Sequence, residues 1–507
     1  MIVGRRHVVR ALLLAGTVGI ALVMAEASLR LLDGYVVFAS TLRPRGPIVA
    51  EPETAQGADR RYVAGVRRAP GVDLDWYFED PPPYRRYPLE PWQQERFNEY
   101  VNDPYPAFFE WNRAYLTERA CKGESDASLR TFLYFDPVEP GPYPAFRHYR
   151  HMSPPGWFVA NAFGWRGPEM SLNKPADTIR IAFVGASTTI SPYYMPFSHP
   201  EFVGYWLNRW SAANGRPYRF EVVNAGRTGI DSHSIAAIVR QELAPVEPDL
   251  VVFYEGANQF WPAREVRYRF GRLYPKPTTT YLMRPGENRS AIVKRILGLV
   301  DRITGRDGSE PPKPPMTPTW AGVIDEQNPD PDDPRLPMAL PAIVRDLDSM
   351  QAAIRGSGGE VVVSSFLWMV KDGMKLDLRL NRNIYDFLNR TYWPIPYAHM
   401  RRMADLQNRV FENYARARGL PFVDLAAEFP LDPNLFGDAI HMRPWGLRLQ
   451  AWIYLQHLIS LIESRVAASR LPQPMQHPRT THPAFDQPSP RFVTPDELRA
   501  GCSTAHS

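Results

Sequence analysis

The chain has 507 residues, of which 44% are hydrophobic and 22% charged, and its formal net charge is +5. This length is too great for one compact core and allows one large domain with tethers and insertions. Basic and acidic residues are interspersed, which is not typical of nucleic-acid-binding proteins, because these gather Lys and Arg on one face. Cys121 and Cys502 have no partner at metal-ligand spacing, so we expect no metal and no cofactor; a disulfide and two free thiols both stay open.

The N-terminus carries an export signal. Arg5, Arg6 and Arg10 precede an uncharged run, Ala11–Ala25, and a basic segment of this kind stays inside while the apolar run enters the membrane. Ala25-Glu26-Ala27 offers a cleavage site, but apolar residues on both sides lengthen the run toward the roughly 20 residues that a span needs. We therefore favour a retained single-pass anchor over residues 1–33. Either outcome places the rest of the chain on the non-cytoplasmic side, periplasmic or extracellular.

Residues 34–174 are rich in proline and aromatic residues, as in Pro81–Tyr84 and Pro104–Phe109. No helical or strand period runs through them. The pattern fits an extended, ordered wrap around the main domain, or a linker that packs aromatic side chains onto it, and both alternatives stay open.

Between 175 and 466, short apolar runs alternate with amphipathic segments. The expected strands are 179–184, 220–223, 250–253, 361–366 and 421–425, and the expected helices are 199–213, 231–243, 342–354, 400–418 and 446–466. This alternation predicts an α/β domain whose mainly parallel five-stranded sheet is covered by helices on both faces. Residues 467–507 are polar and rich in proline, and we expect them to be disordered.

An insertion at about 261–338 interrupts the alternation. It contains Ala291–Ile303, in which apolar residues recur at helical spacing and basic residues fall elsewhere, so the segment predicts an amphipathic helix. We favour a helix packed on the core. A lid or membrane-surface helix is the alternative, because its polar residues are basic.

Polar residues follow the predicted strands at their carboxyl ends, where ligands bind in an open parallel sheet. Ser187 follows the first strand, and its hydroxyl needs a neighbouring base to act as a nucleophile; alone, it is equally well explained as a helix cap. Gly229 follows the second strand, and Asn258 follows the third. Such residues supply N–H donors to an oxyanion, although they also serve ordinary turns.

After the last strand, Asp438 precedes His441 by three residues, and no other histidine in the chain has an aspartate at this spacing. A tight turn there lets the carboxylate orient the imidazole. Together, the strand ends carry a nucleophile, a base, an orienting acid and oxyanion donors, which are the parts of an acyl-transfer site.

These segments resemble the blocks of the SGNH or GDSL-type hydrolases. Gly185–Thr189 matches the nucleophile block, Gly229 the glycine block, Gly256–Asn258 the G-x-N block and Asp438–His441 the D-x-x-H block. The lead-in Asn161–Gly167 is similar to one in membrane-anchored members. Two residues depart from the family pattern: Ala186 replaces the aspartate beside the serine, and Gln259 replaces the last residue of G-x-N-D, which puts the fine substrate assignment in doubt.

The resemblance implies a three-layer α/β/α sandwich over 175–466 with a flavodoxin-like strand order. It implies that Ser187 attacks an ester carbonyl, that His441 is the acid and base, and that Asp438 orients it. The oxyanion donors would be Ser187 N–H, Gly229 N–H and Asn258.

The expected function is hydrolysis of ester bonds through an acyl-enzyme, with O-acyl or O-acetyl groups of cell-envelope or extracellular glycans as the leading substrates. An acyltransferase that uses the same site is one alternative. A non-catalytic glycan-binding or assembly protein that keeps the fold is another, and a lipase working at a membrane is a third, which rests on Ala291–Ile303 alone. The expected partners are an acylated carbohydrate or other ester and the membrane, not nucleic acid.

Overall fold

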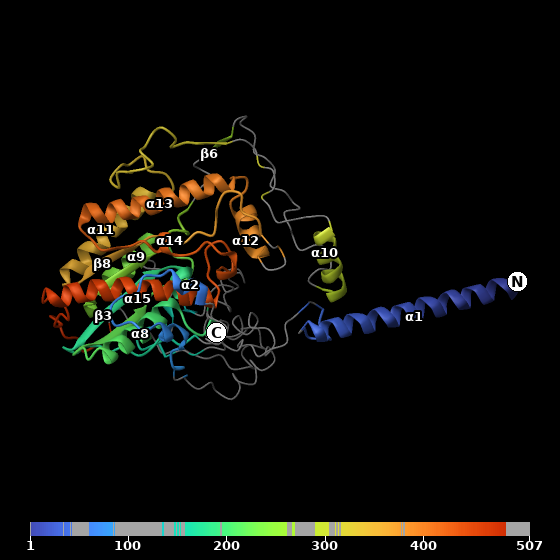
Figure 1. Cartoon of the computed structure of the whole chain (residues 1–507), viewed down its shortest axis with the longest axis horizontal. Helices are drawn as coiled ribbons and strands as arrows, with labels where there is room; N and C mark the ends of the chain where they lie inside the picture. Colours follow the sequence, from blue (N-terminus) through green and yellow to red (C-terminus); the bar gives the residue numbers. More distant parts are fainter. Residues whose placement is uncertain are drawn as a thin grey trace, which may run out of the picture.

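A computed structural model describes residues 2–33, 35–40, 42, 60–84, 86, 134–135, 147–148, 150–151, 153, 158–192, 195–260, 266–268, 289–303, 310, 313, 316–376, 378 and 381–482. Cys121, Cys502 and Pro104–Phe109 lie outside these residues, and so does most of the Pro- and aromatic-rich region. The described residues form an α/β body from which one long helix projects (Figure 1).

The body is built on one parallel sheet. Its strand order is β4 (Arg219–Asn224), β3 (Thr178–Gly185), β5 (Leu250–Tyr254), β8 (Glu360–Ser364) and β9 (Phe422–Val423), and every neighbouring pair is parallel. The first strand in the chain therefore lies between the second and the third, which is the flavodoxin-like order. The predicted fold class is confirmed, and all five carboxyl ends meet at one edge of the sheet.

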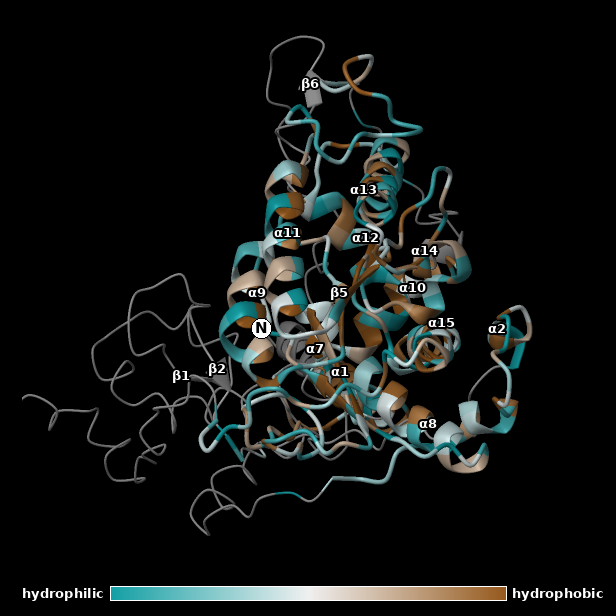
Figure 2. Ribbon diagram, turned by 90° about the vertical axis from the view of Figure 1, so that its left-hand side faces the viewer, coloured by the Kyte–Doolittle hydropathy of each residue, from teal (hydrophilic) through white to brown (hydrophobic). Residues whose placement is uncertain are grey.

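Helices cover both faces of the sheet. On one face lie α8 (His199–Ala213) and α15 (Pro444–Ala467), and on the other lie α9 (Ser232–Ile238), α11 (Leu340–Gly356) and α13 (Tyr397–Arg418). All eight residues of β3 are buried, as expected of a strand covered on both sides. Figure 2 shows the hydrophobic residues gathered on the central strands, with hydrophilic residues on the outer sides of the helices.

Shorter elements complete the described chain. They are α2 (Arg60–Ala64), α7 (Ser187–Ile190), α12 (Arg382–Asp386), α14 (Leu425–Glu428), the π-helical turns Val239–Leu243 and Phe387–Thr391, the 3-10 turns Leu74–Phe78, Ala244–Val246 and Pro433–Leu435, and the strand pairs β1 (Tyr134–Phe135) with β2 (Arg147–His148) and β6 (Val266–Tyr268) with β7 (Met316–Pro318).

The long projecting helix is α1 (Ile2–Leu32). Its stretch Leu13–Leu32 is long and apolar enough to cross a membrane, and almost none of it is buried inside the protein. The amphipathic helix α10 (Ala291–Ile303) has its predicted bounds and lies beside the end of α1. Ile296 and Leu299 on α10 are both 55% exposed. The favoured expectation, a helix packed on the core, therefore does not describe this helix.

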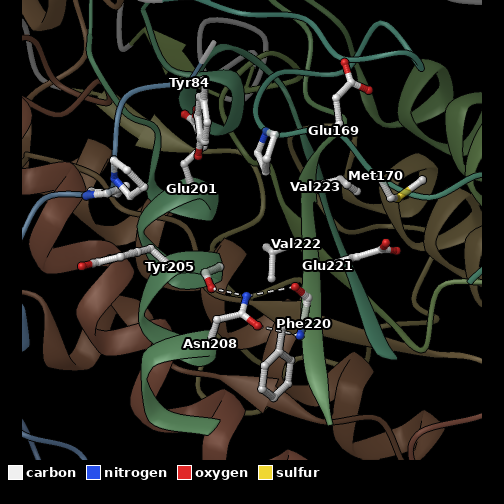
Figure 3. A pocket seen from close by; sticks show the side chains of 14 residues that line it. Tyr84, Glu169, Met170, Glu201, Tyr205, Asn208, Phe220, Glu221, Val222 and Val223 are labelled. Carbon is white, nitrogen blue, oxygen red and sulfur yellow. Dashed lines mark hydrogen bonds between the residues drawn. The ribbon is translucent and has the colours of Figure 1, made fainter. Parts of the chain in front are cut away.

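Strand β4 forms an edge of the sheet, and several of its outward backbone groups are hydrogen-bonded to other parts of the chain. The Asn208 side chain on α8 donates to Phe220 O and accepts from Phe220 N, both at 2.9 Å (Figure 3). Further along, Arg166 N donates to Asn224 O at 3.1 Å. Between α8 and β4 lies a pocket of about 260 Å³, which Pro81, Pro82 and Tyr84 help to line.

Residues 60–84 form an ordered wrap over α8 and α15. Tyr77 is buried between them. The guanidinium of Arg448 donates to Tyr77 O at 2.7 Å, and Trp210 Nε1 donates to Pro70 O at 2.9 Å. Residues 60–84 of the Pro- and aromatic-rich region therefore pack on α8 and α15.

Residues 468–482 are also ordered, which corrects the expectation of a disordered tail for the part of 467–507 that the structure describes. Glu247 and Asp249 are buried carboxylates beside the beginning of β5. Gln476 N donates to Glu247 at 2.5 Å, and Gln473 N donates to Asp249 at 3.1 Å. Buried charges need such partners, and a polar segment supplies them without a hydrophobic period that the sequence would reveal. Residues 483–507 lie outside the described part.

The segment before the sheet belongs to the core of the domain as well, although the predicted domain begins at 175. Phe158, Phe163 and Trp165 are buried. Arg166 is buried too, and its guanidinium pairs with Glu201 at 2.9 Å. It also donates to the carbonyl oxygens of Ile190, Ser191, Pro192 and Met195 at 2.7–3.2 Å.

Replacement of this guanidinium tests how much the body depends on it. We expect Arg166→Met to lower the free energy of unfolding by about 3–5 kcal/mol, because Glu201 then keeps a buried charge without its partner. Urea unfolding of the full chain in detergent measures this. Arg219→Met is the matched control: Arg219 pairs with Asp177 at 3.6 Å, and both side chains are more than half exposed, so a change of under about 1 kcal/mol is expected. Equal losses in the two variants would contradict the prediction.

Candidate active site

Three predicted site residues lie in one hydrogen-bonded chain. His441 Nε2 is 2.8 Å from Ser187 Oγ, and His441 Nδ1 is 2.8 Å from Asp438 Oδ2. Ser187 begins α7 directly after β3, while Asp438 and His441 lie in the loop that leads into α15. Residues 254 positions apart are thus brought together at the carboxyl edge of the sheet.

The turn that presents Ser187 is closely packed between β3 and β5. A Cβ atom on Gly185 would lie 2.1 Å from Tyr254 O and 2.1 Å from Thr189 Oγ1, so only glycine fits there. Thr189 Oγ1 donates to Tyr254 O at 3.0 Å. Ser187 is the first residue of α7, so its N–H has no acceptor within that helix and is open to an oxyanion.

Just beyond α7, Ser191 has a φ of 63°, in the left-handed region that side chains other than glycine rarely adopt. Its carbonyl is one of those that Arg166 binds. Such a conformation persists where the surroundings enforce it. The Arg166 guanidinium therefore supports the loop that follows Ser187.

The Asp438 carboxylate closes its own turn. Asp438 Oδ1 accepts from Ile440 N at 2.9 Å and from His441 N at 2.8 Å. Burial by itself would raise the pKa of Asp438, but the hydrogen bonds from His441 and Ile440 and the His441 charge bring it below its ordinary value. An ionised Asp438 favours the tautomer with hydrogen on Nδ1, which leaves Nε2 free to accept the Ser187 proton.

Two backbone hydrogen bonds also hold the loop that carries Asp438 and His441. Gly437 N donates to His441 O at 2.7 Å, which closes the turn, and Met369 N donates to Ala439 O at 2.8 Å. Met369 lies in the segment that follows β8. The D-x-x-H loop is thus tied to a fourth strand end as well as to Ser187.

The predicted oxyanion donors lie on neighbouring loops. Asn258 Nδ2 donates to Ile230 O at 2.7 Å, which joins the loop after β5 to the loop after β4. This bond uses one of the two amide hydrogens of Asn258. Gly229 has a φ of 73°, and a Cβ there would meet open space. Glycine is required at this position for its backbone conformation.

Glu255 is part of the site framework, and sequence reasoning did not single it out. It is buried, and its Oε1 accepts from Ala257 N and from Asn258 N, both at 2.8 Å. Burial raises its pKa above the ordinary value. The available signal was an acidic residue directly between a buried strand and a G-x-N turn.

Gln259, one of the departures from the family pattern, has a structural contact of its own. Its Oε1 accepts from Ser232 N at 2.8 Å, at the start of α9. The residue therefore joins the loop after β5 to the helix that follows β4, and it makes this contact as a neutral amide.

No group of three or more His, Cys, Asp and Glu side chains among the described residues is arranged to hold a metal ion. The pocket beside β4 is a different part of the molecule, since Ser187, Asp438 and His441 are not among its lining residues. The functional groups gathered at the carboxyl edge of the sheet are a serine hydroxyl, an imidazole, a carboxylate and amide donors.

The Glu255 contacts predict a positioning role. Glu255→Leu removes the acceptor for Ala257 N and Asn258 N, so we expect kcat to fall about 100-fold with little change in KM, because an oxyanion donor acts mainly in the transition state. Glu255→Gln keeps an oxygen at this position and should retain most of the activity. The measurement is steady-state hydrolysis of p-nitrophenyl acetate. A rise in KM alone, or equal losses in both variants, would contradict this role.

The hydrogen bond from His441 to Asp438 predicts a larger effect. Asp438→Asn should lower kcat on the same ester by about 10³–10⁴, because an amide no longer selects the productive tautomer. Asp177→Asn, at an exposed position, is the control and should leave kcat unchanged. A fall in kcat of less than tenfold in Asp438→Asn would contradict the proposed role of Asp438 in orienting His441.

No protein-family model matches the chain, and no curated protein matches it in sequence. Among solved structures it is similar to LAE5, an alpha/beta hydrolase enzyme from the metagenome of Lake Arreo, at 12% identity over 56% of this chain and 96% of that one, with a TM-score of 0.31. Axe2, an acetylxylan esterase from Geobacillus stearothermophilus, matches at 14% identity over 56% and 96%, with a TM-score of 0.31. A GDSL-like lipase from Bacteroides thetaiotaomicron matches at 14% over 57% and 88%, with a TM-score of 0.25. These likenesses concern the fold.

Proposed function

We propose that the chain is a membrane-anchored serine esterase that cleaves ester bonds through an acyl-enzyme. The observation that carries this proposal is the continuous chain from Ser187 Oγ through His441 to Asp438, with both contacts at 2.8 Å. A serine that only caps a helix does not need a histidine hydrogen-bonded to its hydroxyl. A histidine with a purely structural role does not need to contact both a serine hydroxyl and a carboxylate. The arrangement is the one that activates a hydroxyl for attack on a carbonyl.

The reaction follows from these positions. Ser187 Oγ attacks the ester carbonyl while His441 Nε2 takes its proton. The resulting oxyanion accepts hydrogen bonds from Ser187 N, Gly229 N and Asn258 Nδ2. The C–O bond to the alcohol then breaks, and His441 returns the proton to the leaving alcohol. Water attacks the acyl-enzyme with the same base, and the acid and Ser187 are released.

For the substrate, we propose an acylated carbohydrate, with O-acyl or O-acetyl groups on cell-envelope or extracellular glycans. The support is location: the basic residues in the first turns of α1, ahead of its uncharged run Ala11–Ala25, favour a catalytic body on the non-cytoplasmic side, where such glycans are found. An acyltransferase would use the same acyl-enzyme, with a sugar hydroxyl in place of water. The two reactions share every residue described above.

Covalent labelling tests the nucleophile. A fluorophosphonate probe should label the full chain at a single serine, and the label should disappear in Ser187→Ala. Ser464→Ala removes an exposed serine on α15 and should label like the wild type. A folded wild-type chain that takes no label would overturn the enzyme proposal and favour a non-catalytic binding protein.

Product partition separates hydrolysis from transfer. With p-nitrophenyl acetate as donor and a sugar alcohol added as acceptor, a hydrolase releases acetate at the rate at which it releases nitrophenol. A transferase instead accumulates acetylated acceptor and releases little acetate. Either result keeps Ser187 as the nucleophile, and the ratio of products decides which reaction the site performs.

A further inference from the structure

The first turn of α10 is bound to α1 through one carboxylate. Glu26 on α1 accepts hydrogen bonds from Ala291 N at 2.8 Å, Ile292 N at 3.0 Å and Ser290 Oγ at 2.8 Å. A carboxylate at this position satisfies N–H groups that have no partner within the helix and complements the helix dipole. Glu26 therefore caps α10 from another helix, more than 260 residues away.

Further polar contacts strengthen the junction. Arg30 pairs with Glu26 at 2.6 Å, and it donates to Ala39 O at 2.7 Å and to Arg289 O. Asp33 forms an ion pair with Arg295. The polar side of α10 is thus occupied by the end of α1 and the residues that follow it, which leaves the apolar side facing away.

On that apolar side, two large side chains are more than half exposed. Ile296 and Leu299 are each 55% exposed, and Val300 is 39% exposed. Outside α1 and α10, Phe38 and Val323 are the other large hydrophobic side chains that are exposed in the described part of the chain. Several such side chains on one helix, with basic residues opposite, form the pattern of a helix that lies in a membrane interface.

The position of the junction agrees with that interpretation. The uncharged run Ala11–Ala25 ends directly before Glu26, and Glu26 lies toward the C-terminal end of the stretch Leu13–Leu32 that is long enough to cross a membrane, so the junction lies near one end of that stretch. Figure 1 shows α10 lying crosswise to α1 at this point. If α1 crosses the bilayer, α10 runs along its surface.

We propose that α10 is an in-plane interfacial helix, and that Ile296, Leu299 and Val300 insert into the headgroup–acyl boundary of the bilayer that α1 crosses. The inference rests on the membrane anchor in the proposed function. Its occupant is the lipid surface itself, because the exposed face continues from the apolar helix to which α10 is bound.

The arrangement also orients the catalytic body. In Figure 1, α15 ends on the side of the body opposite α1, where the chain continues into residues 468–482, so α15 begins on the side nearer to α1. His441 precedes the first residue of α15 by three positions. If α1 crosses the bilayer, the carboxyl edge of the sheet therefore lies on the side of the body nearer to it.

Depth-dependent quenching tests the proposal on the full chain. Cys121→Ser and Cys502→Ser remove the native thiols, and Leu299→Cys then takes an environment-sensitive fluorophore. In phosphatidylcholine–phosphatidylglycerol vesicles, lipids with a spin label on the acyl chain should quench this fluorophore several-fold and shift its emission to the blue. Val323→Cys, 45% exposed, is the matched apolar control and should show neither change.

The outcomes separate the two proposals. Flotation with the vesicles reports on α1, so a chain that does not float contradicts the anchor. A chain that floats but whose label at position 299 behaves like that at 323 overturns the interfacial helix alone, and favours a helix that stays in water. If quenching instead depends on the amount of protein per vesicle and not on the amount of spin-labelled lipid, a second copy of the chain covers α10. This result would also overturn the interfacial helix. Unchanged fluorophosphonate labelling of Ser187 in each variant shows that the body is folded.

Discussion

The buried guanidinium of Arg166 is the interaction on which the geometry of the loop after Ser187 depends. It binds Glu201 at the start of α8 and the carbonyl oxygens of the loop that follows α7. A buried charge of this kind is stable only with all of its partners in place. The loop after Ser187 therefore cannot rearrange without exposing or orphaning these groups, and the position of the serine is coupled to the packing of the whole body.

The order of the strands explains why separate loops form one site. Because β3 lies between β4 and β5, the loops that carry Ser187, Gly229 and Asn258 leave the sheet side by side. Buried Glu255 and the hydrogen bond from Asn258 to Ile230 then fix the spacing of the last two. Preorganised donors of this kind stabilise a developing oxyanion without further reorganisation.

The strands, the covering helices and the residues that form the hydrogen-bonded chain at Ser187 could be predicted from the sequence. Each depends on a local signal: an apolar run, a helical period, or a polar residue at the end of a strand. Glu255, the ordered residues 468–482 and the junction between α1 and α10 could not be predicted in this way. These features depend on single polar contacts between distant segments, such as Glu26 with Ala291 or Gln476 with Glu247. No periodic pattern in the sequence indicates such contacts.

The Asn208 amide has a consequence for contacts between copies of this chain. An edge strand with open N–H and C=O groups is a template for strand pairing between molecules. On β4, the amide of Asn208 occupies both backbone groups of Phe220, and Arg166 occupies Asn224 O. These contacts leave fewer backbone groups of the β4 edge open to pairing with a strand of another molecule.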